Sequence, residues 1–216
     1  MKAARANAES IDGALVTGLG RLAGRLGIWL HGGSFCEAAE GEHFNTSVIF
    51  TPDGQLAARY RKIHLFGFDG GETTLMSGGD ELVVLDTPLG PTGIATCYDL
   101  RFPELFRALT AGDATVFLMC SGWPTPRIAH WDVLAQARAI EDQAWVIACN
   151  QVGTQGRLVL GGHSIVVSPT GEVVAIAGSD ETVLYADLDL DDIVRGKMDF
   201  DAVGRVGSLI CWENYM

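Results

Sequence analysis

The sequence predicts an α/β protein in which helices cover the outer faces of β-sheets. Paired strands with turn signals between them occupy both ends of the chain, and strands alternate with helices in its middle. No linker or low-complexity stretch divides the 216 residues, and this length is common for one domain. Apolar residues make up 48% of the chain, which is enough to form a buried core.

The first half of the chain is predicted to contain one helix followed by strand pairs. Apolar residues at helical spacing predict a helix over 11–26, with Gly27 as its C-cap. The segment 51–54 (TPDG) predicts a tight turn, because Pro fixes φ and Gly tolerates a positive φ. A Gly-rich loop is expected over 67–80. Strands are expected over 28–33, 46–50, 55–60, 82–86 and 93–96.

The second half is predicted to alternate before it returns to strands. A helix over 102–111 carries Pro103 in its first turn, where the missing N–H costs nothing. A second helix is expected over 128–143. Strands are expected over 115–120, 145–149, 163–167, 173–177 and 183–188, with a turn over 168–171.

The charge balance and the cysteine count restrict the class of protein. With 15 Lys and Arg against 27 Asp and Glu, the net charge of −12 argues against a nucleic-acid surface. No apolar run approaches the ~20 residues of a membrane span, and residues 1–10 lack the apolar region of a secretory signal. The five cysteines form no C-x-x-C pair and no dense framework. We therefore expect a cytoplasmic protein with reduced thiols and without a metal.

Cys97 is the best candidate for a nucleophile. It lies where an apolar strand ends and a helix soon begins, and the positive end of a helix favours thiolate over thiol. A buried core cysteine is the alternative, and this alternative is preferred for Cys36, Cys120 and Cys149, which lie in or beside apolar strands. The polar neighbours of Cys97, which include Asp99, favour a site instead.

Lys62 is the second candidate, since a desolvated lysine offers a fixed positive charge to a developing oxyanion. It stands between an apolar strand and an aromatic run, and the alternative is a solvated lysine at a strand end. His64 is more simply explained as a structural hydrogen-bonding residue than as a base, and no second His stands at metal-binding spacing.

Three stretches together resemble the nitrilase superfamily of carbon–nitrogen hydrolases. They are YRKIHLF at 60–66, GIATCYDLRFPELF at 93–106, and 122–153 with its GWP, HW, QARAIEDQ and ACNQVG motifs. The segment GGHSIVVSPTGEVV at 161–174 also fits, so the resemblance covers roughly residues 20 to 190. The CYDLRFPELFR form is most similar to the branch that contains ω-amidases.

The resemblance implies an α-β-β-α sandwich and a Glu-Lys-Cys triad that needs no cofactor. Cys97 would be the nucleophile, and Lys62 would stabilise the oxyanion together with the backbone N–H of Tyr98. Glu72 best matches a supporting glutamate, with a solvated loop carboxylate as the alternative. Arg101 is either an anchor for a substrate carboxylate or a partner of Asp99.

Two other acidic residues have plainer interpretations. Glu104 lies just inside the helix over 102–111, where a carboxylate suits the helix dipole. Glu141 and Arg138 stand three residues apart on one predicted helix and are expected to pair with each other.

The chain departs from the family pattern at both ends. The family's general-base glutamate ends an early strand, and here only residues 1–10 precede the first helix. Glu9 is interpreted as the beginning of that helix, so the role is not carried onto it. We expect an incomplete N-terminus with impaired catalysis. At the other end, 204–213 repeats the G-x-x-G-x-x-x-C-aromatic-acid spacing of 90–99, and Cys211 resembles a nitrilase nucleophile segment.

The expected organisation is a hydrolase domain over 1–190 and a C-terminal extension over 191–216. The expected activity is that of a thiol hydrolase that cleaves the amide of a small molecule through a cysteine thioester and releases ammonia. Nitrile hydrolysis, favoured only by the C-terminal tail, and a catalytically impaired homologue are the alternatives. The family commonly assembles, so the resemblance also implies a homo-oligomer.

Overall fold

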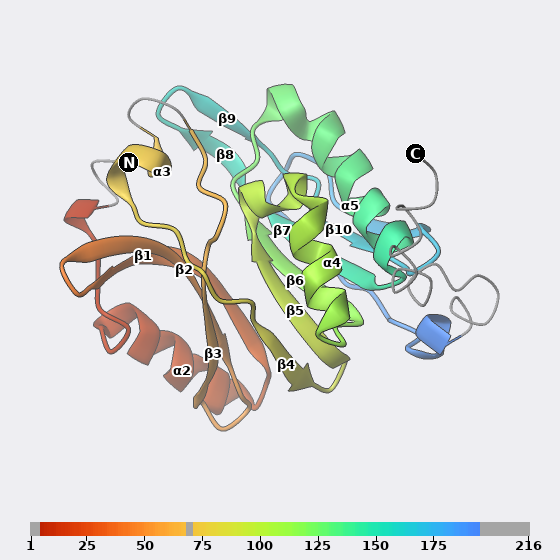
Figure 1. Cartoon of the computed structure of the whole chain (residues 1–216), viewed down its shortest axis with the longest axis horizontal. Helices are drawn as coiled ribbons and strands as arrows, with labels where there is room; N and C mark the ends of the chain where they lie inside the picture. The colour runs from red at the N-terminus through yellow and green to blue at the C-terminus, as the bar shows by residue number, and fades with distance from the viewer. Residues whose placement is uncertain (1–4, 68–70, 195–216) are drawn as a thin grey trace, which may run out of the picture.

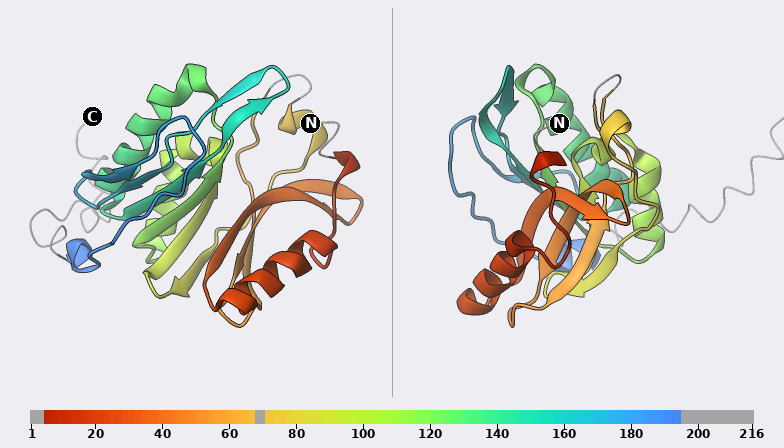
Figure 2. Two further views of the ribbon diagram at one scale, coloured as in Figure 1. Left: turned by 180° about the vertical axis from the view of Figure 1, so that it is seen from behind. Right: turned by 90° about the vertical axis from the view of Figure 1, so that its left-hand side faces the viewer.

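The computed structural model describes residues 5–67 and 71–194 and confirms the predicted layered architecture. Two β-sheets face each other, and helices cover their outer sides (Figure 1). Helix α2 lies outside one sheet, and helices α4 and α5 lie outside the other, so that the order of layers is α-β-β-α (Figure 2).

The first sheet has three antiparallel strands in the order β1-β2-β3. They are β1 (Leu30–Ala39), β2 (Glu42–Phe50) and β3 (Leu56–Arg61), and α2 (Ala14–Leu26) packs on one face through Val16 and Ala23. Gly27 ends α2 at φ +64°, as predicted for a C-cap. Gly54 in the β2–β3 turn has φ +82°, also as predicted, and this turn touches the backbone of α2.

The second sheet has six strands in the order β11-β10-β7-β6-β5-β4, and its three central strands β5, β6 and β7 run parallel. The crossovers between these parallel strands are α4 (Pro103–Ala111) and α5 (Ile128–Asp142), whose apolar faces form the main core with the sheet. The strands are β4 (Val84–Thr87), β5 (Gly90–Thr96), β6 (Val116–Ser121), β7 (Trp145–Asn150), β10 (Ile165–Val167) and β11 (Val173–Ile176).

Strands β1 and β2 extend well beyond the predicted ranges. Their hairpin closes at Glu40 and Gly41, both with positive φ, which is the geometry of a two-residue I′ turn. The predicted ranges miss residues 34–39 and 42–45, where the charged residue Glu37 takes a fully buried position and accepts a hydrogen bond from Thr46 of β2. Hydrophobic alternation therefore could not reveal these strands.

Three further expectations need correction. Residues 183–188 form no strand within the described chain, although Leu184, Ala186 and Leu188 do pack on the second sheet. An unpredicted hairpin, β8 (Val152–Gln155) and β9 (Leu158–Gly161), projects beyond the sheet. The predicted Gly-rich loop contains a short helix, α3 (Glu72–Leu75).

The sequence predicted that Glu9 begins the first long helix, but α2 begins only at Ala14. The backbone of Glu9 pairs with β1, accepting a hydrogen bond from Ala38 N–H and donating one to the Cys36 carbonyl. Its side chain accepts a hydrogen bond from the backbone N–H of Leu15 at 2.9 Å. The Glu9 side chain thus bonds to the first turn of α2 from a segment that pairs with β1.

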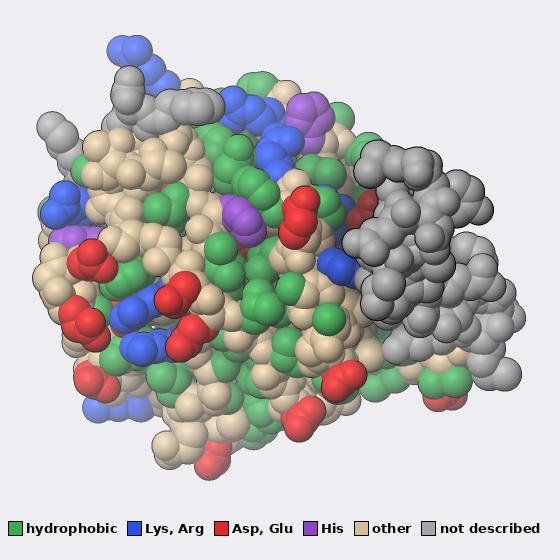
Figure 3. Space-filling view, viewed as in Figure 1, with side chains coloured by type: hydrophobic (Ala, Val, Ile, Leu, Met, Phe, Trp, Pro, Cys, Tyr) green, Lys and Arg blue, Asp and Glu red, His purple; other side chains and the backbone are tan. Residues whose placement is uncertain are grey.

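Most of the proposed extension over 191–216, including Cys211, lies outside the described residues. Within the described part, no helix is long and apolar enough to cross a membrane. On the face shown in Figure 3, acidic and basic side chains are interspersed over the described surface.

Candidate active site

Cys97 stands on a sharp bend at the end of β5. Its φ of +53° is unusual for a residue with a Cβ, and such strained positions concentrate at functional sites. A 3₁₀ turn, η1 (Cys97–Arg101), starts at this residue, and α4 follows immediately. A strained strand-to-helix bend is also how other hydrolases expose a nucleophile. The thiol is partly buried, and it packs against the edge of the main core.

Lys62 follows β3 and is buried, with 1% of its surface exposed, so it is not the solvated lysine of the alternative interpretation. Its Nζ lies 2.6 Å from Oε2 of Glu72, at the start of α3. Glu72 also accepts hydrogen bonds from Asn45 Nδ2 and from the backbone N–H of Phe66, both at 2.7 Å. Three donors thus hold this carboxylate, which is buried rather than solvated.

Strand β2 brings this ion pair and the cysteine bend to one place. The carbonyl of Asn45 accepts the backbone N–H of Lys62 at 2.8 Å. Ser47, two residues further along β2, places its Oγ 2.8 Å from Oγ1 of Thr96, the residue before Cys97. Positions two apart on a strand share a face and lie about 7 Å apart. The lysine segment and the cysteine bend therefore meet neighbouring positions of the same strand.

Asp99 makes a second and more direct connection between the two segments. This carboxylate is fully buried, and its Oδ2 accepts the Tyr60 hydroxyl at 2.7 Å and the backbone N–H of Thr96 at 2.9 Å. Its Oδ1 accepts the backbone N–H of His64 at 3.0 Å and lies 2.9 Å from His64 Nδ1. His64 is therefore a structural hydrogen-bonding residue, as the sequence suggested, and it stacks on Phe102.

Arg101 does not pair with Asp99. Its guanidinium lies 4.8 Å from the ring centre of Trp123 and 5.9 Å from that of Tyr98, and it contacts His130 Nδ1 at 3.2 Å. None of these partners is an acid, so among the described residues the charge of Arg101 has no carboxylate partner. This arrangement suits an anchor for a carboxylate better than the alternative pairing did.

Arg127 is a second cation near the rings around Arg101, and the sequence analysis did not single it out. Arg127 places its guanidinium 5.7 Å from the ring centre of Phe66, which in turn packs edge-on against Tyr98 at 5.1 Å. Its backbone carbonyl accepts the indole N–H of Trp123 at 2.7 Å, which joins it to the ring beneath Arg101. No spacing in the sequence connects residue 127 with residues 66 and 101, so only the fold brings them together.

The remaining candidates take structural places. Glu104 lies in the first turn of α4, and Arg138 pairs with Glu141 at 2.7 Å, both as expected. Cys149, near the end of β7, is exposed rather than buried, which corrects the expectation of a core cysteine. Burial raises the pKa of the Cys120 thiol, which is bonded to Ser47 at 3.4 Å, so this second thiol is held in its neutral form.

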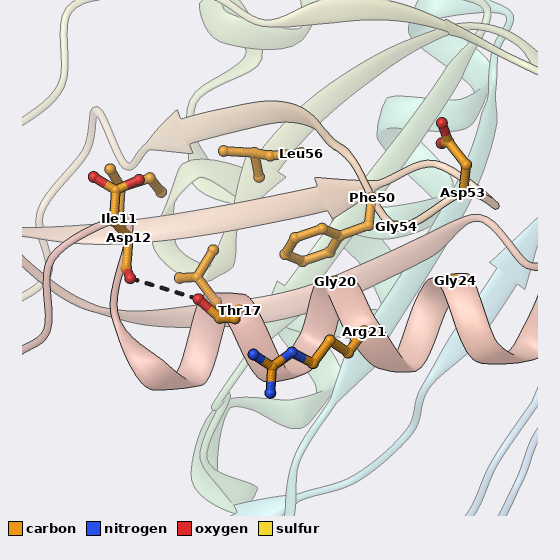
Figure 4. Close-up of a pocket in the computed structure, with 11 residues that line it drawn as sticks. Ile11, Asp12, Thr17, Gly20, Arg21, Gly24, Phe50, Asp53, Gly54 and Leu56 are labelled. Atoms are coloured by element: carbon orange, nitrogen blue, oxygen red, sulfur yellow. Dashed lines mark hydrogen bonds between the residues drawn. The ribbon is translucent and has the colours of Figure 1, made fainter.

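A groove of about 390 Å³ lies apart from this chemistry, between α2 and the β2–β3 turn. Figure 4 shows Gly20 and Gly24 of the helix facing Phe50 and Asp53, while the side chain of Arg21 points away from these two residues. None of the candidate residues lines it. Among the described residues, no group of three or more His, Cys, Asp or Glu side chains is placed to hold a metal ion.

Known proteins share both the sequence and this architecture. The sequence model of the family described as carbon-nitrogen hydrolase matches residues 2–198. A 2-oxoglutaramate amidase from Paenarthrobacter nicotinovorans is 43% identical over 197 residues, which are 88% of this chain and 67% of that protein. Omega-amidase NIT2 from Xenopus tropicalis is 38% identical over 192 residues, 85% of this chain and 70% of that protein.

The fold agrees with a solved member of the same superfamily. The crystal structure of XC1258 from Xanthomonas campestris, a CN-hydrolase superfamily protein with an arsenic adduct in its active site, superposes with a TM-score of 0.86. The two chains are 31% identical, and the match covers 94% of this chain and 78% of that one. On its sequence and its fold, this chain belongs to the carbon–nitrogen hydrolase family and is an enzyme that hydrolyses C–N bonds through a cysteine.

Proposed function

We propose that the enzyme is an ω-amidase type of hydrolase, which releases ammonia from the terminal amide of a small dicarboxylic acid monoamide. The names of its relatives, 2-oxoglutaramate amidase and Omega-amidase, support this substrate class. The observation that carries the chemistry is the buried Lys62–Glu72 pair, which β2 holds beside the bend of Cys97.

The reaction proceeds in two covalent steps. The Cys97 thiolate attacks the amide carbon and forms an S–C bond, and the carbonyl electron pair moves onto oxygen. When this oxyanion collapses, the C–N bond breaks and the nitrogen leaves as ammonia after taking up the proton that the Cys97 thiol lost on becoming a thiolate. Water then adds to the thioester carbon, and the C–S bond breaks to give the carboxylic acid and the free thiol.

Lys62 and the backbone N–H of Tyr98 stabilise the oxyanion in this proposal. A buried ammonium acts strongly there because little water screens its charge. Glu72 holds Lys62 in place, since its two oxygens already accept three hydrogen bonds. We therefore assign Glu72 a positioning role within the catalytic group, and we do not assign it proton transfer.

Arg101 is proposed to bind the far carboxylate of the substrate while the amide lies at Cys97. Tyr98 and Trp123 present ring faces to its guanidinium, and such contacts orient a planar cation without neutralising it. Tyr98 is proposed to contribute to the same substrate-binding surface through its ring.

The test measures ammonia release from α-keto-ω-amides by the purified protein and by Cys97→Ser. We expect the parent to release ammonia and the variant to fall to background. Intact-mass spectrometry should show an acyl adduct on the parent only. Ammonia release that survives in Cys97→Ser would refute Cys97 as the nucleophile.

A catalytically impaired homologue is the second candidate, and one observation favours it. The carboxylates of Glu9, Glu72 and Asp99 are all engaged by donors, so none of these three is free to act as a base. In that case the protein should form the acyl adduct, release about one equivalent of ammonia, and then stop. The same mass and ammonia measurements separate this outcome from steady turnover.

The finer expectations on location and assembly also remain proposals. The four described cysteines are free, which supports a reducing compartment such as the cytoplasm. Exposed Val133 and Ile140 on α5 support a homo-oligomer, which light scattering on the purified protein would test. We keep residues 1–190 as the catalytic domain and 191–216 as an extension of it.

A further inference from the structure

We propose that Asp99 is a positioning residue, whose carboxylate sets the distance between the Lys62 ammonium and the Cys97 thiol. This inference rests on the proposed roles of Lys62 and Cys97. It adds a residue that the sequence treated only as a polar neighbour of the nucleophile.

The carboxylate binds both segments close to their functional residues. On one side it accepts the backbone N–H of Thr96, one residue before Cys97. On the other side it accepts the backbone N–H of His64, two residues after Lys62, and the hydroxyl of Tyr60, two residues before it. One buried group therefore fixes the chain on both sides of Lys62 and next to Cys97.

A purely local role would not require these distant contacts. Asp99 completes a capping box with Thr96 at the start of η1, and this box uses only groups of Thr96 and of Asp99 itself: the Thr96 side chain accepts the Asp99 N–H, and the Asp99 side chain accepts the Thr96 N–H. The bonds to Tyr60 and His64 span 39 and 35 residues and join the end of β3 to the end of β5. These two strands belong to different sheets, so the carboxylate determines how the two sheets present their side chains to each other.

The chemistry of the network requires a carboxylate. Each oxygen faces two polar hydrogen-bonding groups, Tyr60 Oη and Thr96 N at Oδ2 and the two nitrogens of His64 at Oδ1. Burial and the adjacent Asp99 raise the pKa of the Tyr60 hydroxyl far above its ordinary value, so the hydroxyl remains a donor. An amide at position 99 would place its own NH₂ group against N–H or O–H donors at one of the two oxygen positions. Two donors cannot bond to each other, so the hydrogen bonds on that side would be lost.

The test compares Asp99→Asn with two other variants. Asp142→Asn removes a buried carboxylate at the end of α5, away from the site, and serves as the control. Tyr60→Phe removes one of the four contacts and leaves the carboxylate in place. For each variant, kcat and KM are measured on an α-keto-ω-amide, folding is followed by circular dichroism, and iodoacetamide labelling of Cys97 is timed by peptide mass spectrometry. Exposed Cys149 provides an internal labelling standard.

We expect Asp99→Asn to fold and to lose kcat by about 100-fold, the usual effect of a displacement near 1 Å, with KM changed less than about threefold. Its Cys97 labelling rate should change relative to that of Cys149. Tyr60→Phe should show a smaller loss of kcat, and Asp142→Asn should match the parent in kcat and in labelling.

The proposal is overturned if folded Asp99→Asn keeps its kcat and its Cys97 labelling rate, or if its loss of activity only follows a loss of folded protein. If Asp99→Asn does not fold, an unchanged kcat and unchanged labelling in Tyr60→Phe overturn it instead. If the parent proves inactive on every amide, the proposed function fails, and the Cys97 labelling rates still decide the positioning role.

Discussion

Replacing Glu72 with alanine should destabilise the protein far more than breaking an ion pair of equal length elsewhere. The change leaves the Lys62 ammonium buried, with 1% of its side chain exposed, and without its partner at 2.6 Å. It also removes the acceptor of Asn45 Nδ2 and of the Phe66 N–H. A matched control is Glu141→Ala, which breaks an ion pair of 2.7 Å whose glutamate side chain is 44% exposed.

The two magnitudes follow from burial. Breaking a buried pair from one side costs about 3–5 kcal/mol, because it leaves an uncompensated buried charge. Glu141 is already partly solvated, and the buried Arg138 guanidinium keeps its two hydrogen bonds to the Leu100 carbonyl, at 3.2 and 3.1 Å, so Glu141→Ala should cost only about 1 kcal/mol. A typical domain has only about 5–15 kcal/mol of stability, so Glu72→Ala should shift the unfolding midpoint strongly while Glu141→Ala should shift it little.

Urea unfolding at pH 7.5 measures both variants together with a third, Lys62→Met/Glu72→Leu. The double variant removes both charges, so it should recover much of the stability that Glu72→Ala loses. It should nevertheless release no ammonia, because it lacks the group that stabilises the oxyanion. Equal losses for Glu72→Ala and Glu141→Ala would refute the burial argument, and an active double variant would refute the role of Lys62.

Three further changes test the pH response, the substrate anchor and one turn. Burial raises the pKa of Asp142 from an ordinary 3.8 to about 6, and the charge of Arg107 opposes this shift. Between these two pH values the folded protein keeps a proton that the unfolded chain releases, so the stability of the fold falls as the pH rises. Asp142→Asn should therefore gain up to about 3 kcal/mol over the parent at pH 8 and less than about 1 kcal/mol at pH 4, measured by urea unfolding. Arg101→Ala should raise KM about 10- to 100-fold for substrates with a carboxylate and leave neutral amides unaffected in steady-state assays. Gly54→Ala should cost about 1–3 kcal/mol in thermal unfolding, because φ is +82° and its Cβ would meet the Gly20 carbonyl at 2.5 Å.

Elements with an apolar face could be predicted from the sequence, and elements held by buried polar groups could not. Helix α5 and strands β6 and β7 lie within one residue of their predicted ranges, and β5 begins three residues earlier than predicted, since each buries a regular set of apolar side chains. The predicted ranges of the β1–β2 hairpin were too short, because the charged residue Glu37 is buried in the part that they leave out. Burial alone would raise the pKa of Glu37, but bonds from Arg61 and Thr46 lower it, so the charge is kept.

Residues 183–188 show the opposite error, because here the sequence predicts a strand that the structure does not contain. Their alternation correctly predicts which side chains are buried, with Leu184 and Leu188 against the sheet and Tyr185 exposed. A strand also needs a neighbour for its backbone, and the described part of the chain supplies no ladder for this segment. Periodicity therefore determines the buried face of an extended segment without determining its hydrogen-bonding partner.

The sequence predicted those site residues whose sequence neighbours show a recognisable pattern. Cys97 and Lys62 stand at the ends of apolar strands, and the sequence resemblance connects them with Glu72. Arg127 could not be found, because its place depends on a ring contact with Phe66 that only the tertiary structure creates. Asp99 was noticed only as a neighbour of the nucleophile, since its main partners are 35 and 39 residues away in sequence.

The way in which these polar groups are buried explains why the site is built across two sheets. A lysine ammonium can be buried only where its charge is paired and its donors are satisfied, and such a site has little freedom to adjust. Lys62 takes its pairing from Glu72 and its backbone bond from β2, whereas Cys97 sits on a strained bend at the end of β5. Because neither segment can move easily, the bonds of Asp99 and Ser47 between them fix the geometry when the chain folds, before any substrate binds.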